Sequence, residues 1–192
     1  IKKKKYWLPK FKINNDISYK DIVNETDKIL TNSLNIRMRS DVPLAFCLSG
    51  GVDSGYLASL ARKKFSKKIS TFSIIDKDPR YNELENINKI VNDLECYNEQ
   101  ILLSKKENFL KKMKELIVQH DSPISTLSYY IHSFLSEQIS KKGFKVAISG
   151  TGADEIFTGY YEHFHLFFAS LDQDNINFTD ELESWKKNVL PF

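Results

Sequence analysis

Two short turns built from serine and glycine constrain the fold of this chain more than any other feature. Residues 49–54 (SGGVDS) and residues 149–155 (SGTGADE) each follow an apolar run and precede an amphipathic stretch. Each therefore predicts a strand, a small-residue turn and a helix. Glycine lets backbone N–H groups approach an anion, and the following helix points its positive end at that anion. Both turns are therefore typical of phosphate sites.

The segments around the turns alternate between strands and helices. We expect strands at residues 42–48, 69–75, 100–103 and 144–148. Apolar residues at helical spacing predict helices at about 17–38, 56–65, 84–94, 106–118 and 125–140, and one that runs from 154 through 167. This alternation predicts an α/β fold in which a parallel twisted sheet carries helices on both faces. Ligands of such sheets bind beyond the carboxyl ends of the strands, where both turns lie.

Composition argues against several other classes of protein. The 192 residues, 41% hydrophobic and 28% charged, suffice for one ordinary globular domain. The net charge of +3 is too mild to indicate a nucleic-acid partner. No apolar stretch approaches the length of about 18 residues that a membrane span needs, and no signal-like block opens the chain. We therefore expect no membrane partner and a cytoplasmic location. Two cysteines, Cys47 and Cys96, without CxxC spacing argue against a zinc site or a disulfide scaffold.

The carboxylates inside the turns indicate a divalent cation. Asp53 would repel bound phosphates by roughly 1 to 4 kcal/mol per pair of charges at about 4 Å, unless a cation lies between them. Mg²⁺ prefers carboxylates together with phosphate oxygens, so Asp53 and Asp154 are its candidate ligands. The alternative is that Asp53 only interacts with the helix dipole and that the glycines only form a tight turn. The chain contains neither G-x-x-x-x-G-K-[ST] nor a strand followed by G-x-G-x-x-G, which argues against those two nucleotide motifs.

The two turns also carry a resemblance to a known family. Residues 49–54 resemble the SGGxDS loop of the ATP pyrophosphatases. Residues 149–155 with Gly159-Tyr160 resemble the SGxGxDE…GY segment in the synthetase domain of asparagine synthetases, and so do residues 37–43 (RMRSDVP) and Tyr6-Trp7. The resemblance implies an adenine nucleotide alpha hydrolase-like fold of the PP-loop type over residues 17–192, preceded by an N-terminal segment at 1–16.

The resemblance implies an ATP-dependent, amide-forming synthetase. A substrate carboxylate, of aspartate or of another metabolite such as a sugar acid, would attack the α-phosphorus of ATP and release pyrophosphate, and ammonia would then displace AMP from the acyl-adenylate. It implies that Asp53 and Asp154 hold Mg²⁺ and that both stand in catalytic positions together with Thr151. The positions that it implies for binding ATP are Cys47, Leu48, Ser49, Gly50, Gly51, Asp53, Ser54, Ile74, Ser149 and Gly150.

The chain departs from the pattern of the family in three respects. Thr151 stands where asparagine synthetases usually have Glu and β-lactam synthetases have Tyr, and a hydroxyl cannot act as a base near neutral pH without an activating partner. The substrate is therefore left open. The glutaminase domain that would release ammonia from glutamine is absent, and the catalytic Lys of the family lies beyond the matched stretch. We expect a fragment of a longer protein that extends in both directions, with a homodimer as one possible assembly.

Two other functions stay open at this point. The chain could be an ATP-binding module without catalysis, which Thr151 and the missing segments favour. It could also be a PP-loop ATP pyrophosphatase that acts on tRNA or NAD precursors, a class that shares the first turn but not the second.

Overall fold

The structure of the protein, a computed structural model, describes residues 4–10, 16–103, 108–171 and 178–190. The chain divides into two compact units, Ile1–Arg39 and Ser40–Phe192. The described part of the first unit forms one helix, α1 (Tyr19–Arg37), close to the predicted range. Ser18 caps this helix, because its hydroxyl oxygen accepts a hydrogen bond from the N–H of Asp21 at 3.2 Å. The predicted N-terminal segment stays a prediction, since residues 1–3 and 11–15 lie outside the described residues.

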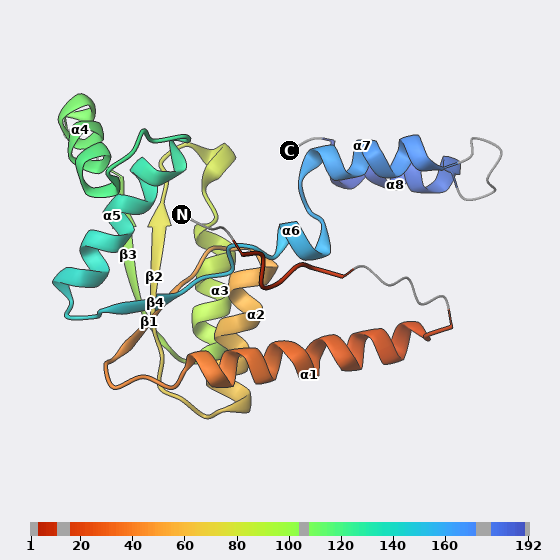
Figure 1. Cartoon of the computed structure of the whole chain (residues 1–192), viewed down its shortest axis with the longest axis horizontal. Helices are drawn as coiled ribbons and strands as arrows, with labels where there is room; N and C mark the ends of the chain where they lie inside the picture. The colour runs from red at the N-terminus through yellow and green to blue at the C-terminus, as the bar shows by residue number, and fades with distance from the viewer. Residues whose placement is uncertain (1–3, 11–15, 104–107, 172–177, 191–192) are drawn as a thin grey trace. The chain divides into compact units, whose positions relative to one another are not determined.

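The second unit is built on a parallel sheet of four strands (Figure 1). The strands are β1 (Leu44–Cys47), β2 (Ser70–Ile75), β3 (Tyr97–Leu102) and β4 (Val146–Ile148), and their order across the sheet is β3-β2-β1-β4. Neighbouring residues of a strand point to opposite faces, and Ala45 and Phe46 of β1 are both buried. The apolar run that predicted β1 therefore reflects a strand covered on both sides. Phe46 pairs with Ile148, so β1 and β4 reach their carboxyl ends at the same level.

Helices cover both faces of the sheet (Figure 1). On one face lie α2 (Val52–Ser59), its π-helical continuation η1 (Leu60–Lys64) and α3 (Leu84–Leu94). On the other lie α4 (Phe109–His120) and α5 (Ser128–Lys141). Under α5 the core contains Ala45, Phe72 and Ile139, and the ring of Phe144 meets that of Phe72 edge-on at 5.4 Å. The prediction of an α/β fold with a parallel sheet between two helical layers is confirmed.

One predicted helix is wrong. The stretch from residue 154 through 167 is not continuous: α6 (Asp154–Phe157) ends, and α7 (Tyr161–Ser170) begins after a break. Thr158 and Gly159 have φ values of +64° and +154°, which a right-handed helix cannot accommodate. The sequence predicted one continuous helix because the apolar residues keep their helical spacing on both sides of the break. α7 packs on α8 (Phe178–Asn188), with the rings of Tyr161 and Trp185 5.5 Å apart.

The other differences concern boundaries. β3 begins at Tyr97, before the predicted start at residue 100, and the first two residues of the helix predicted at 106–118, residues 106 and 107, lie outside the described residues. Of the helices in the described part of the chain, none combines the length and the apolar character needed to cross a bilayer.

Candidate active site

The two Ser/Gly turns meet at one cavity beyond the carboxyl ends of β1 and β4. Its volume is about 480 Å³, within the range usual for small-molecule sites. The predicted site residues that line it are Cys47, Leu48, Ser49, Asp53, Ser54, Ile74, Ser149, Gly150, Thr151 and Asp154. Gly50 and Gly51, which were also predicted to bind ATP, belong to the first turn but do not line the cavity. Because β1 and β4 are neighbours in register, turns that are far apart in the sequence become adjacent.

The hydroxyl groups of the first turn hold its backbone. The N–H of Ser49 donates to Oγ of Ser54 at 3.0 Å, and the two serine hydroxyls lie 2.9 Å apart. The N–H of Gly51 donates to Oγ of Ser49 at 3.2 Å. Gly51 is the N-cap of α2 and makes no side-chain cap, and the first N–H groups of a helix have no partner within it. The start of α2 can therefore donate to an anion in the cavity.

Gly150 allows the second turn to contact the first. A Cβ atom at Gly150 would lie 2.8 Å from the backbone nitrogen of Ser54 and 3.0 Å from Cβ of Asp53. Only glycine permits so close an approach of two backbone segments. Within the second turn, the hydroxyl of Ser149 donates to Oγ1 of Thr151 at 3.1 Å. This contact between the turns is what places Asp53 and Asp154 on the same cavity.

The break between α6 and α7 leaves room for the carboxylate of Asp154. A Cβ atom at Gly159 would lie 1.9 Å from Oδ1 of Asp154, so the carboxylate occupies the space that any other residue would fill. The hydroxyl of Tyr160 donates to Glu155 at 2.7 Å, which lowers the pKa of Glu155 and raises that of Tyr160. The N–H of Gly159 donates to Nδ1 of His163 at 3.2 Å. The Gly-Tyr pair noticed in the sequence thus has a structural role beside the second turn.

Asp53 and Asp154 fit a magnesium ion that is shared with phosphates. Mg²⁺ is commonly bound by one or two carboxylates, while phosphate oxygens and waters complete its coordination. Among the residues that the structure describes, no group of three or more His, Cys, Asp and Glu side chains could hold a metal ion by itself. Two carboxylates on one cavity therefore suit a metal that arrives with a nucleotide.

Sequence reasoning missed one third of the cavity wall. The additional lining residues are Phe72, Glu83, His132, Leu135 and Ser136. His132 and Ser136 stand four residues apart on α5 and so share one helix face, but this spacing is equally usual in a packing face. Phe72 and Leu135 form an apolar surface, and burial at the end of β1 raises the pKa of the nearby Cys47 thiol. These residues come from the strand and helices around the turns, which short motifs do not reveal.

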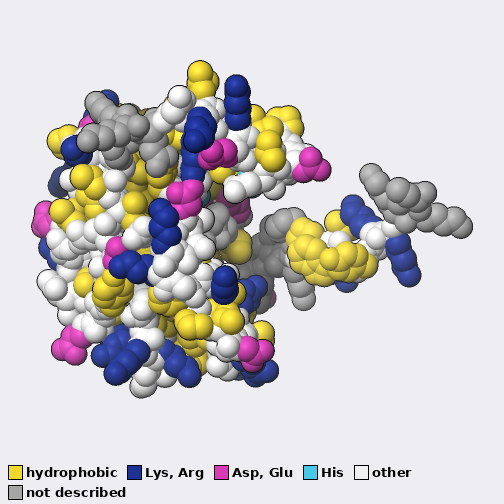
Figure 2. All heavy atoms as spheres, turned by 90° about the vertical axis from the view of Figure 1, so that its left-hand side faces the viewer, with side chains coloured by type: hydrophobic (Ala, Val, Ile, Leu, Met, Phe, Trp, Pro, Cys, Tyr) yellow, Lys and Arg dark blue, Asp and Glu magenta, His cyan; other side chains and the backbone are white. Residues whose placement is uncertain are grey.

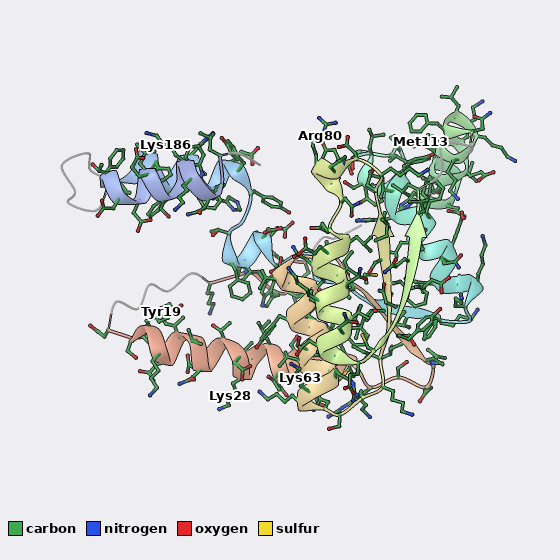
Figure 3. All side chains as sticks on the ribbon, turned by 180° about the vertical axis from the view of Figure 1, so that it is seen from behind. Tyr19, Lys28, Lys63, Arg80, Met113 and Lys186 are labelled. Carbon is green, nitrogen blue, oxygen red and sulfur yellow. The ribbon has the colours of Figure 1, made fainter. Side chains whose placement is uncertain are left out.

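A charged pair stands on the connection that follows β2. Arg80 belongs to η2 (Pro79–Tyr81), and its guanidinium lies 2.6 Å from the carboxylate of Asp78. Their hydrogen bond lowers the pKa of Asp78 and raises that of Arg80. Figure 3 shows Arg80 beyond the carboxyl end of β2, whereas Lys63 lies at the opposite end of the sheet. The charged groups at the cavity end of the sheet therefore extend beyond the two turns.

Comparison with known proteins places the chain in a family. The sequence profile of the family described as asparagine synthase matches residues 25–189, which include both turns. The chain is 31% identical over 157 residues to asparagine synthetase (glutamine-hydrolyzing) 1 of Bacillus subtilis, covering 78% of this chain and 24% of that protein. It is 26% identical over 155 residues to asparagine synthetase B (glutamine-hydrolyzing) of Escherichia coli, covering 74% of this chain and 28% of that protein.

The chain therefore spans about a quarter of the length of these curated relatives. Among solved structures it is similar to an NH3-dependent NAD synthetase from Campylobacter jejuni, with 18% identity and a TM-score of 0.39 over 68% of this chain and 56% of the other. The profile match covers most of the chain and includes the two turns that form the cavity. The chain belongs to the asparagine synthase family.

Proposed function

We propose that this protein is part of an ATP-dependent synthetase that converts a substrate carboxylate into an amide. The observation that carries the proposal is the meeting of two anion-type turns and two carboxylates at one cavity. A carboxylate oxygen of the substrate attacks the α-phosphorus of ATP, the bond from that phosphorus to the bridging oxygen breaks, and pyrophosphate leaves. Ammonia then forms a bond from nitrogen to the acyl carbon, and AMP and a proton are released.

Different parts of the cavity wall suit different parts of the bound nucleotide. The hydroxyls of Ser49 and Ser54 and the N–H groups at the start of α2 suit the leaving pyrophosphate. Asp53 and Asp154 would hold Mg²⁺, whose charge would offset that of the phosphates. The apolar part of the wall suits the adenine ring and is formed by Leu48, Phe72, Ile74 and Leu135.

The proposed substrate is a small carboxylate, either aspartate or another acid such as a sugar acid. Thr151 lines the cavity, but a hydroxyl cannot act as a base near neutral pH without an activating partner, and Ser149 donates to this hydroxyl and does not accept its proton. The ammonia would come from glutamine through a glutaminase domain elsewhere in the full-length protein. On the face shown in Figure 2, Lys and Arg side chains are interspersed with Asp and Glu, a mixture that favours a small-molecule substrate over a nucleic acid.

The test is to incubate the full-length protein with ATP, Mg²⁺, glutamine and a panel of carboxylic acids. We expect AMP and pyrophosphate to form in equal amounts when one acid of the panel is present. Asp53→Asn should abolish their formation. The matched control is Asp93→Asn, because Asp93 pairs with Lys63 at 2.6 Å, at the far end of the sheet, and does not line the cavity.

Two outcomes would contradict the proposal. Release of ADP and orthophosphate would mean that the γ-phosphorus is attacked instead of the α-phosphorus. Thermal stabilisation by Mg·ATP without turnover of any acid would indicate the non-catalytic ATP-binding module instead.

A further inference from the structure

A carboxylate from outside the two turns is bound to the first turn. Oε2 of Glu83 accepts a hydrogen bond from the N–H of Gly50 at 3.1 Å, across 33 residues of sequence. Glu83 stands immediately before α3 and lines the same cavity as Asp53 and Asp154. An acidic residue at a helix start is ordinary in sequence, so only the fold reveals this contact.

The start of α3 is packed closely against the turn. A Cβ atom at Gly50 would lie 2.8 Å from Cβ of Glu83 and 2.9 Å from Cβ of Asn86. The first helical N–H of α3, that of Leu84, is bound by the side chain of Asn82 at 2.9 Å. Glu83 makes no side-chain cap for its own helix. Its carboxylate is therefore available to the turn, and the missing side chain at Gly50 is what lets α3 come so near.

We propose that Glu83 is a positioning residue that holds the first turn in the shape that binds pyrophosphate. Ser54 and Ser49 already supply acceptors for the N–H groups of Ser49 and Gly51. Glu83 supplies the acceptor for the N–H of Gly50, which lies between them. The N–H groups of Ser49, Gly50 and Gly51 then all have acceptors within the protein. The N–H groups that remain for the phosphates are those at the N-terminal end of α2. This inference rests on the proposed function.

The charge on Glu83 makes this contact strong. A hydrogen bond to a carboxylate is roughly twice as strong as one between neutral groups, which suits a turn that keeps its shape before the ligand arrives. The opposite interpretation is that the carboxylate occupies the position of a phosphate oxygen and must leave when ATP binds. In that case its charge would oppose binding. The two interpretations predict opposite changes in affinity when the carboxylate is removed.

The test measures the Kd of Mg·ATP by calorimetry for the full-length protein and three variants. Glu83→Ala should raise the Kd about ten-fold or more, as expected for the loss of a hydrogen bond to a charged group. Glu83→Gln should recover about half of the lost binding free energy, because its amide oxygen still accepts from Gly50 but carries no charge. Glu85→Gln is the matched control, since Glu85 is in the first turn of the same helix but is exposed and pairs with Lys89 at 2.7 Å.

Steady-state kinetics supply the second measurement. A positioning role at the pyrophosphate turn raises KM for ATP in Glu83→Ala and leaves KM for the carboxylic acid unchanged, a split that general destabilisation would not produce. An unchanged or lower Kd in both Glu83 variants would overturn the inference. If the unmodified full-length protein does not bind Mg·ATP, the proposed function itself is overturned, and this is seen before any variant is made.

Discussion

Replacing Gly150 by Ala changes the contact that brings the two turns together. The new Cβ would lie 2.8 Å from the backbone nitrogen of Ser54, and 3.0 Å and 3.1 Å from two atoms of Asp53, whereas ordinary contacts begin at 3.4 Å. The turns would therefore have to part by about 0.6 Å, the difference between 3.4 and 2.8 Å. The nearest neighbour is a backbone atom, so no side chain can rotate away to relieve the contact.

The size of the effect follows from this displacement. Overpacking of this kind typically costs about 1–3 kcal/mol of unfolding free energy. A misplacement of about 1 Å between reacting groups can cost about 100-fold in rate, so we expect kcat/KM for AMP formation to fall roughly 10- to 100-fold. The assay follows AMP and pyrophosphate in the full-length protein. Thermal unfolding, measured in parallel, should show a decrease of about 2–4 °C in Tm for each kcal/mol lost.

Gly55→Ala is the control for this experiment. Gly55 lies in α2, near the same turn, and a Cβ there would meet only the flexible end of the Ile90 side chain, at 3.1 Å from Cδ1. We expect this variant to keep its activity. If Gly150→Ala also turned over ATP at the normal rate and bound Mg·ATP normally, close approach of the turns would not determine the geometry of the site, and the reasoning would be refuted.

Three further predictions concern other parts of the fold. Gly159→Ala should displace the Asp154 carboxylate, whose Oδ1 lies 1.9 Å from the added Cβ, and should raise the Mg²⁺ concentration for half-maximal activity about ten-fold or more; an unchanged Mg²⁺ titration would contradict this. Glu99 has its pKa lowered from 4.5 to about 2 by hydrogen bonds from Tyr97, Lys142 and Gln138. Because the folded state has the lower pKa, this contribution to stability is complete above about pH 4.5 and is lost as the pH falls toward 2. Glu99→Gln should therefore flatten the dependence of unfolding free energy on pH in that window, as measured by urea denaturation, and parallel curves would disprove it. Ile139→Ala, in the core beside Ala45 and Phe72, should lower the unfolding free energy by about 2–5 kcal/mol in the same assay, and a loss below about 1 kcal/mol would show that the core collapses around the gap.

The central strands could be predicted from the sequence because both of their faces are buried. Ala45, Phe46 and Phe72 are all buried, and such strands appear as continuous apolar runs. For the edge strand β3 the sequence predicts a start at residue 100, three residues after the actual start at Tyr97, because the first residues of the strand are polar or exposed. Tyr97 is 49% exposed, and Glu99 pairs with Lys142 at 2.9 Å, so the start of this strand depends on backbone pairing with β2.

The candidate site could be predicted where its residues are close together in sequence. The two turns, Ser49 to Ser54 and Ser149 to Asp154, can be recognised in the sequence because small residues and carboxylates stand at fixed spacing in them. Glu83 and His132 could not be found in this way, since each reaches the cavity from an element whose local pattern is that of an ordinary helix. The break at Gly159 was hidden for a related reason, because the aromatic residues that follow it keep the spacing of the helix before it.

The position of β4 also determines when the cavity can form. β4 comes last in sequence among the described strands, yet it pairs with β1, the first of them. During synthesis β1, β2 and β3 emerge before β4, so the first turn with Asp53 is made before the partner carboxylate Asp154. Any ligand that bridges both turns will therefore bind only chains in which β4 has docked. By mass action such a ligand favours chains in which β4 is paired with β1, so its binding stabilises the strand pairing that brings the two turns together.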